Sequence, residues 1–112
     1  MSNTNLNTLK VTDPGNAGAI PVTAVNMVCN MVSAGAGETR TLADPKFVGQ
    51  TCTLTHDTDG GGITVTAASV INKAGNNTME FAHLRDSALL VAVTAGGALR
   101  WQLFGDDDLT LG

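Results

Sequence analysis

The segment QTCTLTH, residues 50–56, alternates small apolar and polar side chains one by one. Cys52 and Leu54 fall on one face of an extended chain, and the threonines between them fall on the other. This period of two is typical of a β-strand with one buried and one open face. The sequence therefore predicts a half-buried strand at the centre of the chain.

The segments that follow extend this pattern. Residues 63–66 (ITVT) come after a Gly-rich loop, which predicts a hairpin with the strand at 51–56. Residues 87–94 are almost continuously apolar, which predicts a central strand covered on both faces. In the last strand, residues 98–104, we expect Trp101 to point into the core together with its alternate neighbours, Leu99 and Leu103.

Turn signals rich in Gly, Pro, Asn and Asp recur about every 8–12 residues, and no window keeps helical spacing. The predicted fold is all-β: a single small antiparallel β-sandwich or barrel-like domain over residues 20–112. Residues 1–19 are rich in Asn and Thr and offer little to bury, so we predict an extended N-terminal arm there. The strand pattern then begins at Ile20.

Composition limits the classes of function. The 112 residues are 43% hydrophobic but only 4% aromatic, and the net charge is −4. The six basic residues are scattered, whereas nucleic-acid binding needs clustered cations, so no nucleic-acid partner is expected. No apolar run is long enough for a membrane span or a secretory signal, so no membrane partner is expected. Charged residues make up only 14%, which is common in proteins that pack against copies of themselves.

The residues that could carry chemistry do not form a recognisable site. Cys29 and Cys52 are interpreted as two buried small hydrophobes in strands, with a disulfide as the alternative. His56 and His83 are not at metal-ligand spacing, and the predicted metal ligands are none. No nucleophile motif or phosphate-binding loop is present, so the sequence predicts no catalytic residues, no cofactor and no enzymatic activity.

Two acidic segments can be compared with known cation-binding patterns. Asp57 and Asp59 match the first and third positions of a calcium-binding loop, and Gly62 matches the sixth. Gly61 and Ala68 stand where two further oxygen ligands are needed, which favours a Gly-rich loop tip with Asx turns. The second segment, residues 106–108, is interpreted as a solvated run of charge.

Four segments carry a resemblance to a known family: ETRTLADPKFVGQ at 38–50, DTDGGGITVT at 57–66, INKAGNNTMEF at 71–81 and GGALRWQLFG at 96–105. Together they resemble small structural proteins of tailed bacteriophages, of the head decoration or cement type. The resemblance implies a viral structural protein that binds the outside of the capsid and stabilises the shell. Its partners would be the major capsid protein and itself. It would be made in the host bacterial cytoplasm and end on the virion exterior.

A capsid offers threefold and quasi-threefold positions, so we expect a homotrimer. The alternative is a fibre-type or receptor- or glycan-binding virion module. In either case the arm is the candidate anchor, because its backbone needs hydrogen-bonding partners and it has few apolar groups to fold with. The candidate capsid-binding residues are Asn3, Asn5, Leu6 and Leu9.

Overall fold

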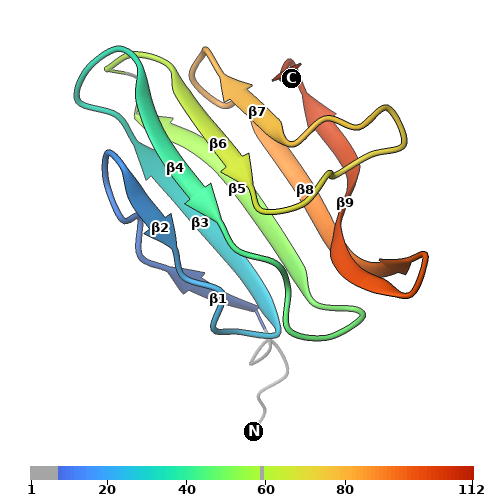
Figure 1. Ribbon diagram of the computed structural model, residues 1–112. Helices are drawn as coiled ribbons and strands as arrows, with labels where there is room; N and C mark the ends of the chain where they lie inside the picture. The colour runs from blue at the N-terminus through green and yellow to red at the C-terminus, as the bar shows by residue number, and fades with distance from the viewer. Residues whose placement is uncertain (1–7, 59) are drawn as a thin grey trace, which may run out of the picture.

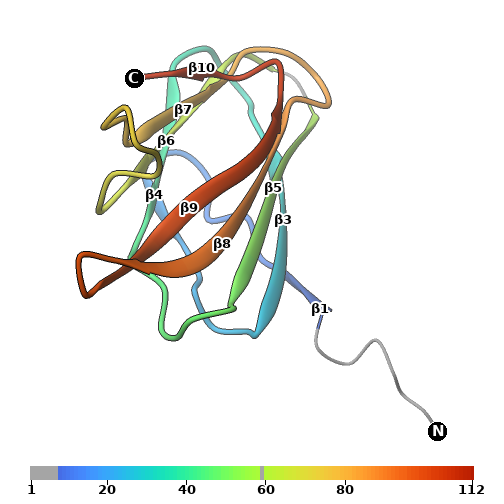
Figure 2. The same ribbon diagram turned by 90° about the vertical axis from the view of Figure 1, so that its right-hand side faces the viewer.

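The protein is a sandwich of two five-stranded sheets, here seen in a computed structural model that describes residues 8–58 and 60–112 (Figures 1 and 2). Sheet A has the order β1-β3-β5-β8-β9, and sheet B has the order β10-β7-β6-β4-β2. The strands of sheet A are β1 (Thr8–Val11), β3 (Asn26–Val32), β5 (Thr51–Thr58), β8 (Ser87–Ala95) and β9 (Ala98–Asp107). Those of sheet B are β2 (Gly18–Ile20), β4 (Glu38–Leu42), β6 (Ile63–Ala67), β7 (Thr78–Phe81) and β10 (Thr110–Leu111). The predicted all-β sandwich is confirmed.

The first six strands wind as a coil between the two sheets. They alternate strictly between sheet A and sheet B, and each from β3 to β6 pairs in parallel with the strand two before it. In sheet A, for example, Thr8 lies opposite Asn26, and Asn26 lies opposite Thr51. We call β1–β6 the coil region.

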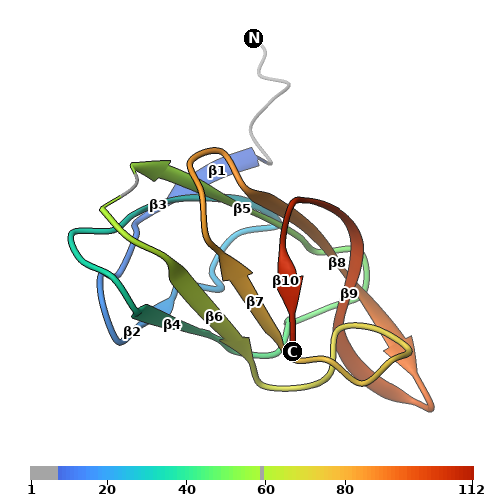
Figure 3. The ribbon, with the colours of Figure 1, turned by 90° about the horizontal axis from the view of Figure 1, so that it is seen from above.

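The last four strands pair in the antiparallel manner, and we call β7–β10 the hairpin region. β7 pairs with β6, β8 lies between β5 and β9, and β10 closes sheet B beside β7 (Figure 3). Gly96 and Gly97 both have positive φ and make the tight turn from β8 to β9. Of the eight strand pairs among the described residues four are parallel, so the expectation of antiparallel pairing holds for half of them only.

The predicted hairpin between residues 51–56 and 63–66 is wrong. These strands, β5 and β6, lie in opposite sheets, and each pairs in parallel with an earlier strand of the coil. The glycines of the connecting loop explain the error, because a Cβ on Gly60 or Gly61 would collide with the backbone of residues 33–36. Their small size lets one loop of the coil pack on the next rather than making a hairpin tip.

The strands also begin earlier than predicted. Strands β1 and β2 lie within residues 8–20, which the sequence assigned almost entirely to the arm. Both are short and carry few large apolar groups, so periodicity gave no signal for them. They are held by parallel pairing with β3 and β4, a tertiary interaction that local sequence does not encode.

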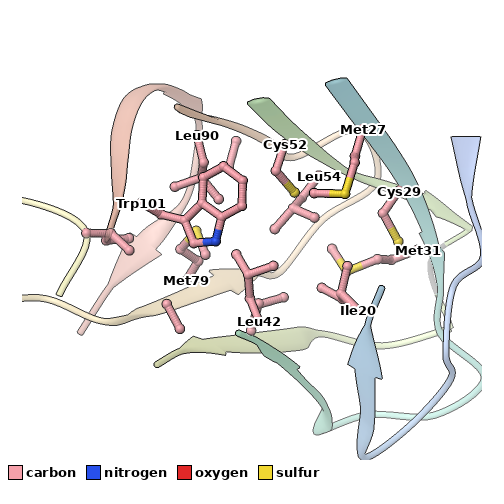
Figure 4. Packing of buried hydrophobic residues seen from close by; sticks show 14 of the residues in the cluster. Ile20, Met27, Cys29, Met31, Leu42, Cys52, Leu54, Met79, Leu90 and Trp101 are labelled. Carbon is pink, nitrogen blue, oxygen red and sulfur yellow. The ribbon is translucent and has the colours of Figure 1, made fainter. Parts of the chain in front are cut away.

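The space between the sheets is filled mainly by side chains of moderate size. Figure 4 shows two parts of this core: Trp101 lies with Leu42, Met79 and Leu90, and the other labelled sulfur-containing side chains gather towards the coil region. Those side chains are Met27, Cys29, Met31 and Cys52, from β3 and β5. The prediction that Trp101 is a core residue is confirmed, with Leu99 and Leu103 partly buried against the same core.

The two cysteines are free and fully buried, as the sequence favoured. Burial raises the pKa of the Cys29 thiol to about 11 and that of the Cys52 thiol to about 12. Both therefore behave as small apolar groups in the core and not as nucleophiles or metal ligands.

Candidate functional site: a free strand edge and the open face of sheet A

The N-terminal strand β1 forms one edge of sheet A and pairs with β3 only. The backbone groups on its other side have no neighbouring strand within the described residues, so this edge can accept one from another chain. Leu9 shares the core-facing side of β1 with the buried Val11, yet it is 51% exposed because the sheet ends there. Of the four predicted capsid-binding residues, only Leu9 falls within the described part of the chain; Asn3, Asn5 and Leu6 lie outside it.

Directly after β1, the chain is fixed to the domain by a buried ion-pair network. The Arg40 side chain, from β4, is fully buried and donates from Nε to Asp13 Oδ1 at 2.8 Å and from Nη2 to Asp13 Oδ2 at 3.2 Å. Asp13 also accepts the backbone N–H of Val32. These hydrogen bonds hold the pKa of Asp13 below its usual value, against the raising effect of burial, which is the largest single influence on it. The base of the N-terminal segment is thus fixed in position.

Glu38 completes the network. Its Oε1 accepts from Arg40 Nη1 at 3.0 Å, and its Oε2 accepts from the backbone N–H groups of Ala34 and Gly35. The bond from Ala34 is the largest influence on the pKa of Glu38, which lies below its usual value. One guanidinium therefore joins the segment after β1 to the end of β3, through the carbonyl oxygen of Val32, and to β4.

The outer face of sheet A is the second feature. Side chains of β3, β5 and β8 alternate between the core and this face, as their burial patterns show. Its rows follow the strand register: Asn26, Thr51 and Val91 in one, and Val28, Thr53 and Leu89 in the next. The Thr51 hydroxyl donates to Asn26 Oδ1, and the Thr55 hydroxyl donates to Asn30 Oδ1, both at 2.7 Å. These side-chain bonds between strands keep the rows aligned.

The three inner strands carry no charged side chain over residues 26–30, 51–55 and 87–93, and the outer strands border this stretch with Lys10, opposite Val28, and Arg100, opposite Val93. Leu89 is 43% exposed, and Phe104, at the bulge in β9 opposite β8, is 63% exposed. The prediction that residues 87–94 are covered on both faces is therefore wrong for the isolated chain. The strand is central in its sheet, but nothing among the described residues covers its outer side.

Both acidic segments, at residues 57–59 and 106–108, contribute a side chain to the same surface hollow. Asp57, Arg85 and Asp107 line a hollow of about 390 Å³ together with Thr55, His56 and Ser87. The sequence did not favour a calcium site in the loop at 57–62, and of its two candidate carboxylates Asp59 lies outside the described residues. Elsewhere, His83, Asp86 and Asp108 place three potential metal-ligating atoms within 4.8 Å of one another.

Ser33 and His56 form a buried contact that superficially resembles a nucleophile and its base, with Oγ and Nε2 3.2 Å apart. The Ser33 hydroxyl instead donates to the carbonyl oxygen of Gly61 at 2.6 Å, and it accepts the N–H of Gly60. His56 Nδ1 donates to the carbonyl oxygen of His83. These bonds tie three loops together, so both side chains have a structural role.

Sequence reasoning did not identify Arg40, Asp13 or Glu38 as a unit. A signal was present, because Glu38, Arg40 and Leu42 share one face of the segment ETRTL and Leu42 points into the core. An arginine on the buried face of a strand needs carboxylates, and Glu38 supplies one of them. The second, Asp13, is far away in sequence and follows only from the fold.

Comparison of the chain with protein-family models and with curated proteins finds no match. The described residues also contain no helix that is long and apolar enough to cross a membrane.

Proposed function

We propose that this protein is a structural protein of a tailed-bacteriophage virion that decorates the outside of the head shell. The observation that carries the proposal is the uncharged, partly apolar stretch of β3, β5 and β8 on the outer face of sheet A, in the same sheet as a free strand edge. A strand as apolar as β8 is typical of sheets covered on both sides, so a second cover has to come from another chain. The resemblance of residues 38–104 to decoration proteins assigns that cover to copies of the chain and to the major capsid protein.

In this proposal the outer face of sheet A is the contact between subunits of a homotrimer. Chains of net charge −4 repel one another, and they approach at least cost where no carboxylates meet, as across β3, β5 and β8, which Lys10 and Arg100 border. Closed threefold symmetry repeats one interface between subunits three times and matches the threefold positions of a shell.

The trimer is tested by placing a charge on each sheet in turn. Leu89→Asp puts a carboxylate on the outer face of sheet A, and Thr66→Asp puts one on the outer, exposed face of sheet B as a matched control. We expect native mass spectrometry to find trimers of the wild type and of Thr66→Asp, and monomers of Leu89→Asp. A monomeric wild type at micromolar concentration, or equal behaviour of the two variants, would reject this interface.

The shell contact is assigned to the segment that precedes β1. Deleting residues 2–7 keeps β1, β2 and Asp13, so the fold and the ion-pair network remain, whereas deleting residues 2–19 would remove all three. We expect the shorter deletion to stay trimeric and to lose binding to undecorated shells by orders of magnitude in co-sedimentation. Wild-type binding after this deletion would move the anchor to the domain itself.

The exposed aromatic rings favour the second candidate, a glycan-binding fibre module. Phe104 and Phe47 are both exposed, and exposed rings are the usual platforms for sugars. Phe104→Ala and Phe47→Ala should leave shell binding intact if the first proposal holds. Saturable binding to a host polysaccharide that these substitutions abolish would instead establish the second.

A further inference from the structure

The cluster of His83, Asp86 and Asp108 joins two connections of the hairpin region. His83 and Asp86 belong to the loop between β7 and β8, and Asp108 lies in the turn between β9 and β10. His83 Nδ1 lies 3.4 Å from Asp108 Oδ2 and 3.9 Å from Asp86 Oδ2. Both distances exceed the roughly 2.7–2.9 Å of a charge-assisted N–H···O hydrogen bond. The three atoms thus face one another without direct bonding.

Those distances suit a shared metal ion. A tetrahedral zinc ion holds nitrogen and oxygen ligands at about 2.0–2.2 Å, which places neighbouring ligand atoms roughly 3.4 Å apart. One imidazole nitrogen and two carboxylate oxygens form a three-ligand set that leaves a fourth position for water. The imidazole also discriminates between ions, because calcium takes oxygen ligands.

Burial of Asp86 is an independent reason to expect a cation. Its side chain is only 5% exposed, and its one ion-pair partner among the described residues is His83. The loop holds this carboxylate in place, because Asp86 Oδ2 accepts the backbone N–H of His83 at 2.8 Å. A buried carboxylate is costly unless it is paired or coordinates a metal.

The loop is also held in position before any ion arrives. The backbone N–H of Arg85 donates to the carbonyl oxygen of His56, and the N–H of His56 donates to the carbonyl oxygen of Asp86. Asp108 and His83 are 69% and 73% exposed, so an ion can reach the site from solvent. One ligand is thus fixed and buried, and two are accessible.

We propose that His83 Nδ1, Asp86 Oδ2 and Asp108 Oδ2 bind one divalent transition-metal ion of the zinc class. The bound ion would join the β7–β8 loop to the β9–β10 turn and so fasten β10 at the edge of sheet B. This inference does not depend on the proposed role in the virion.

The test is zinc binding by the full chain, measured by isothermal titration calorimetry and by thermal unfolding. We expect one Zn²⁺ per chain and a rise in Tm of at least about 5 °C at saturation, because an ion that binds only the folded state stabilises it. His83→Gln and Asp108→Asn each remove one ligand at an exposed position and should abolish both signals. Asp106→Asn removes an exposed charge nearby, outside the cluster, and should preserve them.

Two further measurements separate this site from other sources of binding. Excess Ca²⁺ should not displace Zn²⁺, and the Co²⁺ complex should lack the thiolate charge-transfer band that Cys29 or Cys52 would produce. Near-ultraviolet circular dichroism of the metal-free variants checks that they remain folded. The proposal is overturned if the wild type binds no zinc, if the two ligand variants bind it normally, or if Ca²⁺ competes equally.

Discussion

The coil region and the hairpin region share one sandwich but are stabilised by different interiors. In the coil region, sulfur-containing side chains of β3 and β5 fill the core, and the fully buried Arg40 links successive turns of the chain. In the hairpin region, Trp101 fills the space between the sheets, and its Nε1 donates to the carbonyl oxygen of Ala43 at 2.9 Å. The difference follows from the connections: coil strands lack tight turns to set their pairing, so a polar network fixes their positions.

The largest effect is expected at Trp101. Trp101→Ala should lower the free energy of unfolding by about 3–5 kcal/mol, because a cavity adds to the lost transfer energy. It also leaves the carbonyl oxygen of Ala43 without this donor. Urea denaturation measures the loss, and Trp101→Phe, which keeps an aromatic ring in the core, should lose less. Ordinary point mutations lower the free energy of unfolding by about 1 kcal/mol. A loss of only about that size in Trp101→Ala would show that the indole does not hold the hairpin region.

A slightly smaller loss is expected at Arg40. Arg40→Leu leaves Asp13 and Glu38 facing each other without a cation, and breaking a buried pair in this way costs about 3–5 kcal/mol. We expect the lower end, because both carboxylates are slightly exposed and keep backbone N–H donors.

The control for Arg40 neutralises its partners. The triple variant Arg40→Leu, Asp13→Asn, Glu38→Gln removes the uncompensated charges and should recover much of the lost stability in urea denaturation. If the triple variant is no more stable than Arg40→Leu, the loss comes from packing of the arginine side chain and not from charge.

The sequence predicts strand pairing in the hairpin region but not in the coil region. In the hairpin region, the glycines after β8 and the alternation of apolar and polar residues around Trp101 predict both β8 and β9 and their pairing. In the coil region, the alternation of apolar and polar residues predicts β5 and β6 but not their partner strands. Each partner is a parallel strand that lies a full turn of the coil away in the chain. Strands β1 and β2 are too short to have a period at all.

The candidate site was predictable to the same limited extent. The sequence names Leu9 as one of the few large apolar groups of a predicted arm, and the structure places it, exposed, on the edge strand β1. The uncharged stretch on the outer face of sheet A could not be predicted, because it forms only when β3, β5 and β8 come together in register. The His83, Asp86 and Asp108 cluster likewise needs the turn after β9 to return to the β7–β8 loop.

Acid should weaken the coil region before it affects the rest. The pKa values of Asp13 and Glu38 are lowered in the folded protein, so the folded state binds fewer protons than the unfolded chain. Their contribution is complete above the unfolded pKa values of about 4 and is lost as the pH falls through the lower folded values. We expect Tm to fall below about pH 4, and to fall less steeply in Asp13→Asn. An unchanged slope in that variant, with exposed Asp106→Asn as the control, would contradict this.

The smallest effect is expected in the alkylation rates of the two buried thiols of the coil region. The comparison tests whether sheet A opens more readily near its free edge, at β1, than at its centre. Cys29 lies on β3, which only β1 separates from the edge, whereas Cys52 lies on β5 at the centre of sheet A. Both thiols are buried with raised pKa values, so alkylation has to proceed through local opening of the sheet. Strands near an edge open more readily, and a tenfold faster reaction of Cys29 would correspond to about 1.4 kcal/mol less opening free energy. Mass spectrometry of the single-thiol variants Cys52→Ala and Cys29→Ala under native conditions compares the two rates, and equal rates would show that β1–β6 opens as one unit.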